Sequence, residues 1–346
     1  MKLAVNNVLL LIITFTILFC TICMVGLRNL KSFPGQSYKG ALPPEIPEEA
    51  FIRSELKLHV ETLATKIGER NFERYDELNT AADYIEQSFW ETGLSVQRQL
   101  YSIENKTYYN IEAEKKGLHQ PDEIIVVGAH YDSVLGSPGA NDNGSGIAGV
   151  LSLARAFSTK TPSRTIRFVA FTNEEPPFFW TKKMGSYVYA KRCKERKENI
   201  IAMLSLETIG CYSDKEKSQH YFPLLGFFYP SQGNFIGFVS NLSSRKLLRE
   251  VIGSFRRHTQ FPSEGGAFPG ITPGMFWSDH WGFWKMGYHA LMVTDTAFLR
   301  YPYYHTAQDT VDKINYESMS RVVAGLEKVL DDLSGVSRIT GSHLNY

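Results

Sequence analysis

Cysteine is scarce in this sequence, and net charge is almost absent. Only four of the 346 residues are cysteines, and two of them, Cys20 and Cys23, lie in the apolar N-terminus. Only Cys193 and Cys211 remain, so the folded part has no disulfide framework, and at most one disulfide bridge is possible. The 37 basic and 36 acidic residues nearly cancel, so no long-range field favours nucleic acid or an anionic membrane surface. Any partner must be recognised through a local site.

Repeats, low-complexity tracts and a phosphate-binding loop are also missing. Residues 139–146 are rich in glycine, but the P-loop pattern G-x-x-x-x-G-K-[ST] does not occur. Nucleotide binding is therefore not indicated. The chain does have 43% hydrophobic and 13% aromatic residues, which is enough for a large core. Its length suits one sizeable α/β domain with appendages.

Residues 8–27 form an apolar run without a single charge, after a short start that contains Lys2. A run of this length can cross a bilayer. A cleaved signal peptide is the alternative, but no convincing small-x-small cleavage site follows the run. We predict an N-terminal membrane anchor or signal segment at residues 1–30 and prefer the anchor. Its orientation is open, because Arg28 and Lys31 compete with Lys2.

Residues 31–47 contain four prolines and two glycines. This composition predicts a linker that holds the following domain, residues 48–346, away from the membrane.

From residue 48 onward, hydrophobic spacing and turn residues predict alternating strands and helices. Helices are expected at residues 48–67, 75–92, 145–157, 185–196, 243–258 and 316–333. Strands are expected at residues 95–101, 107–114, 123–129, 166–171, 200–206, 235–239 and 290–294. This order predicts an α/β fold whose mostly parallel, mixed sheet carries helices on both faces.

The stretch from residue 164 to residue 177 organises the chain. Its apolar run, residues 166–171, predicts a strand buried on both faces, and that strand leads into Glu174 and Glu175. Open α/β sheets bind ligands outside the carboxyl ends of their strands. Two adjacent carboxylates repel each other there, and a divalent metal would compensate them.

Other predicted strands also lead to residues that bind metals. The strand at 123–129 runs into His130 and Asp132, the strand at 200–206 into Glu207, and the last strand is followed by a loop with His305. The glycines around Asp142 let that side chain turn back towards the same edge. Imidazole and carboxylate both suit zinc, and the set is large enough for two ions.

Each of these residues has an ordinary explanation when taken alone. A single histidine is often part of the core, and a single carboxylate often faces water. Asp132 and Asp279 could cap helices or form loop ion pairs, and we interpret His280 and His289 as structural. The metal hypothesis therefore depends on the whole set.

Five segments, taken in order, resemble a known family. They read VGAHYDSV at residues 127–134, GANDNGSG at 139–146, FTNEEP at 171–176, SDH at 278–280 and YHTAQDT at 304–310. They are similar to co-catalytic zinc aminopeptidases related to bacterial leucyl aminopeptidase and glutamate carboxypeptidase II. The resemblance spans about residues 51–333 and implies a phosphorylase/hydrolase-like fold of the zinc exopeptidase type.

The resemblance also implies roles for single residues. Asp142 would bridge two zinc ions, with His130 and Glu207 completing one site and Glu175 and His305 the other. Glu174 would be the general base, and Asp132 would orient His130. Glu207 departs from the family pattern, which more often has Asp there. Tyr304, which precedes His305, is a candidate to stabilise the oxyanion or simply an aromatic packing residue.

The expected function is hydrolysis of the N-terminal peptide bond of peptides with a free amine, by a metallo-aminopeptidase on the extracytoplasmic side, as in secreted relatives. Residues 211–284, with Phe178, Phe179 and Trp180, are expected to line an apolar side-chain pocket. One alternative is a glutaminyl-peptide cyclase, which resembles this family but uses one zinc. Another is a catalytically silent ectodomain, although such relatives usually lose ligands.

Overall fold

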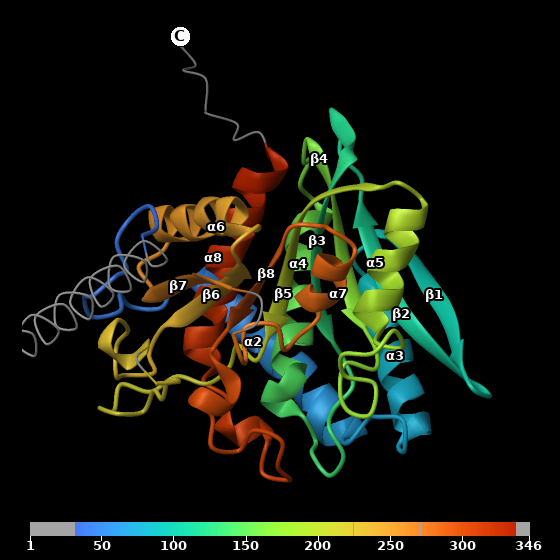
Figure 1. The fold of residues 1–346 in the computed structure, drawn as a ribbon, viewed down its shortest axis with the longest axis horizontal. Coiled ribbons are helices and arrows are strands. Elements are labelled where there is room, and N and C mark those ends of the chain that lie inside the picture. The colour runs from blue at the N-terminus through green and yellow to red at the C-terminus, as the bar shows by residue number, and fades with distance from the viewer. Residues whose placement is uncertain (1–31, 224, 270–271, 337–346) are drawn as a thin grey trace, which may run out of the picture.

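The computed structural model describes residues 32–223, 225–269 and 272–336. Their central feature is one eight-stranded mixed sheet of order β1-β2-β4-β3-β5-β8-β6-β7 (Figure 1). Strands β3, β4, β5 and β8 run parallel, whereas β1 and β2 form an antiparallel hairpin at one edge and β6 and β7 run opposite to β8 at the other. The strands are β1 Ser95–Ile103, β2 Lys106–Lys115, β3 Gln120–His130, β4 Arg164–Phe171, β5 Asn199–Glu207, β6 Ile236–Asn241, β7 Ser263–Phe268 and β8 Ala290–Thr294.

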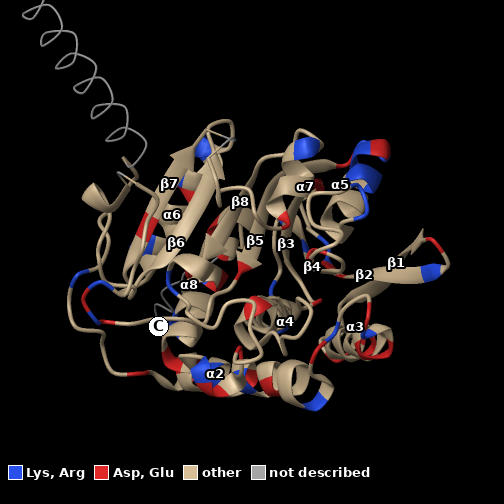
Figure 2. Cartoon of the chain, turned by 60° about the horizontal axis from the view of Figure 1, so that its bottom comes forward, with Lys and Arg blue, Asp and Glu red and all other residues tan. Residues whose placement is uncertain are grey.

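Helices cover both faces of the sheet, as the alternating pattern predicted. In Figure 2, α5 and α7 lie above the sheet, and α2, α3 and α4 lie below it. The core follows this division, with a large apolar cluster on the α4 side and a smaller one on the α5 side. The helices are α2 Pro47–Glu61, α3 Tyr75–Trp90, α4 Gly146–Ser158, α5 Gly185–Glu195, α6 Arg245–His258, α7 His280–Lys285 and α8 Tyr316–Ser334. Short turns occur at Thr62–Ile67, Ala140–Ser145, Leu225–Phe227, Ala297–Leu299 and Val311–Lys313.

The register places the ends of the central strands at one edge. His130 of β3 pairs with Phe171 of β4, and Glu207 of β5 pairs with Thr294 of β8. The last residues of β3 and β4 are buried on both faces, as their continuous apolar runs predicted. Side chains that follow these strands therefore emerge close together.

Two elements were not expected from the sequence. Strand β7 contains Glu264, Gly265 and Gly266, and glycine weakens an isolated strand. Its pairing with β6 along Ile236–Asn241 makes it a strand nonetheless. Helix α7 has only six residues, too few to show a helical repeat. Cys193 and Cys211 are free thiols, so the described residues contain no bridge between them.

The predicted linker does not act as a spacer in the described residues. Residues 32–46, here called the N-terminal strap, lie along the domain. The backbone N–H of Ser263 donates to Ser37 Oγ at 2.9 Å, and Arg321 donates to the Pro43 carbonyl at 2.8 Å. The prolines and glycines of this segment therefore belong to an irregular stretch of chain that packs on the domain, and not to an extended, free linker. Within the described residues no helix has the length and apolar character to cross a bilayer, and residues 1–30, the predicted anchor, lie outside them.

Candidate metal centre

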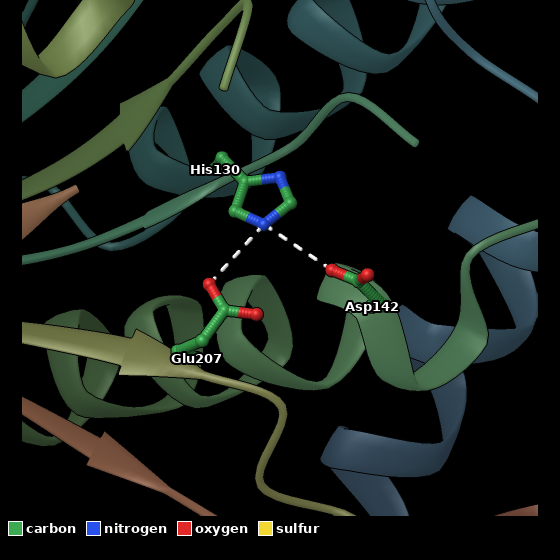
Figure 3. A group of neighbouring side chains, drawn as sticks. All are labelled: His130, Asp142 and Glu207. Carbon is green, nitrogen blue, oxygen red and sulfur yellow. Dashed lines mark ion pairs between the residues drawn. The ribbon is translucent and has the colours of Figure 1, made fainter. Parts of the chain in front are cut away.

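Three side chains from three elements meet at the carboxyl edge of the sheet (Figure 3). His130 ends β3, Glu207 ends β5, and Asp142 lies in the turn Ala140–Ser145 before α4. His130 Nε2 is 3.3 Å from Asp142 Oδ1 and 3.3 Å from Glu207 Oε2. All three residues are buried. The structure thus brings together the first predicted ligand set.

A second set shares Asp142. His305 Nε2 lies 3.0 Å from Asp142 Oδ2 and 3.4 Å from Glu175 Oε1. One oxygen of Asp142 therefore faces each histidine. Both Asp142 Oδ2 and Glu175 Oε1 are buried and lack a hydrogen bond within the described residues, despite their closeness to His305. Atoms that converge without hydrogen-bond geometry are typical of ligands that face a common ion.

The spacing of these atoms fits zinc. Zinc–nitrogen and zinc–oxygen bonds of about 2.0–2.2 Å at tetrahedral angles place two ligand atoms roughly 3.3–3.6 Å apart. Of the four histidine–carboxylate distances, three are 3.3 to 3.4 Å and the fourth, between His305 and Asp142, is 3.0 Å. The donor set of two imidazoles and three carboxylates is also one that zinc accepts. The residues present therefore fit two zinc ions that share Asp142.

Glu174 stands next to this set but farther from its histidines. Its Oε2 is 3.9 Å from His130 Nε2, longer than the contacts of Asp142 and Glu207. His130, Glu174 and Glu175 could by proximity form a further ligand group. We prefer the two groups around Asp142, because their atoms are closer and together use both Asp142 oxygens.

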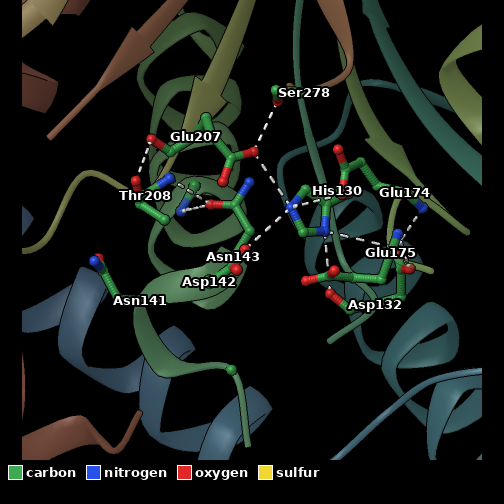
Figure 4. Close-up of polar contacts among 12 residues, drawn as sticks. His130, Asp132, Asn141, Asp142, Asn143, Glu174, Glu175, Glu207, Thr208 and Ser278 are labelled. Atoms are coloured by element: carbon green, nitrogen blue, oxygen red, sulfur yellow. Dashed lines mark hydrogen bonds and ion pairs between the residues drawn. The ribbon is translucent and has the colours of Figure 1, made fainter. Parts of the chain in front are cut away.

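Asp132 has a different main contact from the one expected (Figure 4). Its carboxylate accepts the backbone N–H of Glu174 at 3.1 Å and that of Glu175 at 3.0 Å. His130 Nδ1 lies 3.1 Å from the backbone carbonyl of Asp132 and 3.6 Å from its carboxylate. Asp132 therefore positions the two glutamates as well as the histidine.

Asp309 holds the turn that carries Asp142. Its carboxylate accepts the backbone N–H of Asn141 at 2.8 Å and of Asp142 at 3.0 Å, and it also accepts from the Tyr301 hydroxyl at 2.7 Å. No role for Asp309 was predicted from the sequence. Its place four residues after His305 was the available indication.

Arg70 is a second residue that sequence reasoning missed. Arg70 is fully buried. Its guanidinium donates to the backbone carbonyl of Tyr131, just after β3, at 2.6 Å and to that of Gly139, just before the turn that carries Asp142, at 2.9 Å. It donates further to the carbonyls of Leu63, Gly68 and Pro138. None of these acceptors is a carboxylate, but the positive charge of Arg70 interacts with the nearby carboxylates of Asp132, Asp309, Asp142 and Glu175.

Burial and mutual charge set the protonation of the centre without metal. Burial raises the pKa of Glu174 well above its usual value and that of Glu175 to about 7. Burial disfavours the imidazolium of His305, but the nearby carboxylates of Asp142 and Glu175 outweigh it and raise the pKa of His305 to about 10. Burial also disfavours the imidazolium of His130, but the negative charges of Glu174 and Glu207 outweigh burial and raise the pKa of His130 well above its usual value. The metal-free site therefore holds protons that a cation must displace.

Glu207 is held from the adjoining loop. Ser278 Oγ donates to Glu207 Oε2 at 2.7 Å, and burial raises the pKa of Glu207. Asp279, the next residue, is fully buried, and neither of its oxygens has a hydrogen-bond partner among the described residues. Burial raises the pKa of Asp279 to about 8. It is neither a side-chain cap of α7 nor an ion-pair partner among the described residues.

A mostly apolar pocket opens beside Glu207 and Tyr304. Phe222, Met275, Trp277, Met292 and Phe298 form its apolar lining, together with Val239, Ala297 and Leu299. The predicted segment 211–284 thus supplies part of the wall, and residues 292–299 supply the rest.

Phe178, Phe179 and Trp180 do not line this pocket. Phe178 packs against Tyr108, and Trp180 packs against Phe276 in a tilted arrangement with ring centroids 4.7 Å apart. Tyr304 stacks on His305 at 3.9 Å, and burial, followed by the charge of Asp142, raises the pKa of Tyr304. Its phenol therefore stays neutral and able to donate.

Two relatives cover large parts of the chain. The uncharacterized protein YfbL of Escherichia coli is 36% identical over 304 residues, which span 85% of this chain and 92% of YfbL. The aminopeptidase YwaD of Bacillus subtilis is 28% identical over 229 residues, 64% of this chain and 44% of YwaD.

Solved structures share the fold. The zinc aminopeptidase BSAP from Bacillus subtilis matches with a TM-score of 0.67 at 16% identity, covering 86% of this chain and 98% of BSAP. The glutaminyl cyclase of Porphyromonas gingivalis matches with a TM-score of 0.61 at 16% identity, covering 81% and 98%. The sequence profile of peptidase family M28 matches residues 110–330. The chain therefore belongs to peptidase family M28.

Proposed function

We propose that this protein is a zinc-dependent aminopeptidase that hydrolyses the N-terminal peptide bond of peptides through a centre of two zinc ions. The observation that carries the proposal is the placement of the two Asp142 oxygens, one 3.3 Å from His130 and the other 3.0 Å from His305. A carboxylate shared in this way suits a pair of metals rather than a single one. Family membership and the aminopeptidase relative support the reaction class.

The proposed ligands are His130, Asp142 and Glu207 for one ion, and Asp142, Glu175 and His305 for the other. Zinc, when bound, supplies Lewis acidity that polarises the scissile carbonyl and makes a water molecule more acidic. Ser278 and Asp132 hold Glu207 and Glu175 in place through the hydrogen bonds described above.

Glu174 is the proposed general base. Its carboxyl group lies at the centre, its backbone is held by Asp132, and its raised pKa suits a group that accepts a proton and later releases it. It would take the proton of the attacking water and pass it to the leaving amine. The neutral phenol of Tyr304 is placed beside Glu207 and is proposed to donate to the oxyanion.

The pocket favours substrates with an apolar first residue. Its lining includes two methionines and four large aromatic side chains, Phe222, Trp277, Phe298 and Tyr304. Transfer of an apolar side chain into such a lining is favourable by about 1.5–3 kcal/mol for a leucine-sized group. We expect leucyl, methionyl and phenylalanyl substrates to exceed aspartyl and lysyl ones in kcat/KM.

The cyclase alternative rests on one observation, the shared fold of the solved glutaminyl cyclases. It needs one zinc and no hydrolytic water, whereas the two candidate groups that share Asp142 support a pair of ions. A catalytically silent domain would need neither group.

Two measurements on the purified chain separate these readings. Metal analysis should find two zinc ions per chain, against one for the cyclase and none for a silent domain. In parallel, aminoacyl amides, the same amides with acetylated amines, and an N-terminal glutaminyl peptide are assayed. The proposal expects cleavage of the free amines alone. Cleavage of the acetylated set would refute an aminopeptidase, and ring closure of the glutaminyl peptide would favour the cyclase.

We also propose that residues 1–30 hold the chain in a membrane with the catalytic domain on the extracytoplasmic side. The uncharged run at residues 8–27 supports anchoring. Protease treatment of spheroplasts tests both points, because it should degrade the domain without breaking the cells. A domain protected on the cytoplasmic side would overturn the orientation.

A further inference from the structure

We propose that the β7 edge of the domain rests on a lipid bilayer, with residues 221–223 and 225–230, here called the apolar loop, in the headgroup interface. The sequence across this stretch reads YFPLLGFFYP and contains no charged side chain. Phe227 within the loop is 86% exposed, the highest value among the exposed large apolar side chains of the described residues. One exposed apolar side chain is ordinary by itself, but this one stands on an uncharged loop, and aromatic side chains are favoured at membrane–water interfaces.

The apolar loop lies against the edge of the sheet. The Tyr229 hydroxyl donates to the Gly265 carbonyl of β7 at 2.9 Å. Tyr221 and Leu225 face Gly237 of β6 and Gly266 of β7 across an apolar cavity. In Figure 1 the loop, in yellow, lies beside β6 and β7 at the left of the molecule. Its position on the domain is therefore set by contacts with the edge strands.

The N-terminal strap meets the same strand. The ring of Phe33 approaches Gly265 so closely that a Cβ there would lie 3.0 Å from it, and the Ser32 carbonyl accepts from Arg249 of α6 at 2.6 Å. Only residues 28–31 separate Ser32 from the uncharged run at 8–27. Five residue steps span at most about 18 Å. If the run is the anchor proposed above, the bilayer must lie close to this edge.

Basic residues lie on the helix that meets the start of the strap. Arg245, Lys246 and Arg249 occupy the first turns of α6, and in the sequence Arg28 and Lys31 follow the uncharged run. Glu250 is the acidic residue of this helix and lies 4.0 Å from Lys246. Such a cluster beside a membrane segment attracts anionic headgroups. Chain entry, apolar exposure and charge thus indicate the same side of the domain, and a lipid surface is the occupant that matches all three.

This surface reaches the substrate pocket. Phe222 of the apolar loop lines the pocket beside Glu207, and Val239, Met275, Thr296 and Leu299 are common to that pocket and the cavity beneath the loop. The bilayer would therefore support one wall of the pocket from outside. The inference concerns the placement of the domain and does not depend on the catalytic roles proposed for the metal ligands.

Photochemical cross-linking of the full chain tests the proposal. p-Benzoylphenylalanine replaces Phe227, and in a matched control it replaces Leu100, which is 65% exposed on β1 at the far edge of the sheet. Both proteins are reconstituted in vesicles of phosphatidylcholine and phosphatidylglycerol, irradiated and analysed by mass spectrometry. Adducts with phospholipid at position 227, several-fold above those at position 100, are expected. Equal yields, no lipid adduct at 227, or adducts with a second copy of the chain would overturn the proposal.

A charge variant tests the contribution of α6. Lys246→Glu should lower the lipid adduct at position 227 several-fold in vesicles that contain phosphatidylglycerol, but not in phosphatidylcholine alone. Lys191→Glu is the matched control, since Lys191 also has a glutamate four residues later but lies on α5. Equal effects of the two variants would contradict the charge argument. Washing with alkaline carbonate tests the anchor separately, because released chain refutes the anchor while the adduct at 227 still reports on the loop.

Discussion

The carboxylate of Asp132 accepts the backbone N–H groups of both Glu174 and Glu175, although these residues follow a different strand. Asp132 thereby sets the direction of two side chains with different proposed roles. We expect Asp132→Asn to lower kcat about 10–100-fold, because an amide can accept with only one of its two terminal atoms. Asp122→Asn, at an exposed position near the start of β3, is the control. An Asp132→Asn enzyme with full kcat would argue against this positioning.

Glu174→Gln separates the base from the ligands. The amide removes proton acceptance without removing a proposed metal bond, so the variant should retain zinc while kcat falls about 10²–10⁴-fold. Glu175→Gln should instead lose zinc, and added zinc should partly restore its activity. Metal content and turnover measured on the same samples give the answer. If Glu174→Gln loses metal and Glu175→Gln keeps it, the two roles are exchanged.

Asp142 should matter more for metal retention than Glu207. Asp142→Asn removes charge from both proposed ion sites, whereas Glu207→Asp keeps the charge and only shortens one arm. In Glu207→Asp the shorter carboxylate can accept the hydrogen bond from Ser278 only if one of the two side chains moves. We therefore expect this variant to lose a small fraction of its zinc. Zinc remaining after dialysis is the measurement. Equal losses in the two variants would contradict a shared role for Asp142.

Zinc affinity should rise with pH. In the metal-free chain the pKa of His305 is raised to about 10 and that of His130 is also raised, so both imidazoles hold protons at neutral pH. Zinc must displace these protons, and the displacement becomes easier as pH increases towards those pKa values. Competition titrations with a chelator at pH of about 6, 7 and 8 should show a falling apparent dissociation constant. A constant value across this window would mean that the histidines are already neutral.

Arg70 should be important for stability as well as for the site. Arg70→Met leaves buried carbonyls without hydrogen-bond donors and removes a cation from an acidic region. We therefore expect the free energy of unfolding to fall by about 3 kcal/mol or more. Arg70→Lys should recover part of it, because the charge stays but the fork of donors does not. Arg74→Met at an exposed position is the control. The midpoint of urea unfolding measures the effect, and similar midpoints for Arg70→Met and Arg74→Met would refute it.

Much of the centre was predictable because the ligands follow buried strands. Val126 and Phe168 belong to short apolar runs, which indicate strands covered on both faces. Parallel strands end at one edge, so His130, Glu174 and Glu207 had to lie near one another. The glycine-rich turn and the motif resemblance added Asp142 and His305. The family relation confirms the reaction class, while the separate roles of these residues are still predictions.

The amino-acid sequence by itself determined the strand and helix pattern, and with it the edge at which the acidic and histidine side chains gather, because local periodicity reports which faces are buried. Only the tertiary structure decided that Asp142 faces two histidines, that Asp309 and Arg70 hold the surrounding loops, and that β7 and the strap are part of the domain. These features depend on contacts between residues far apart in the chain. Each of these features is stabilised by a strand-pairing partner or a buried hydrogen-bond donor, and the local pattern of residues does not indicate where that partner lies.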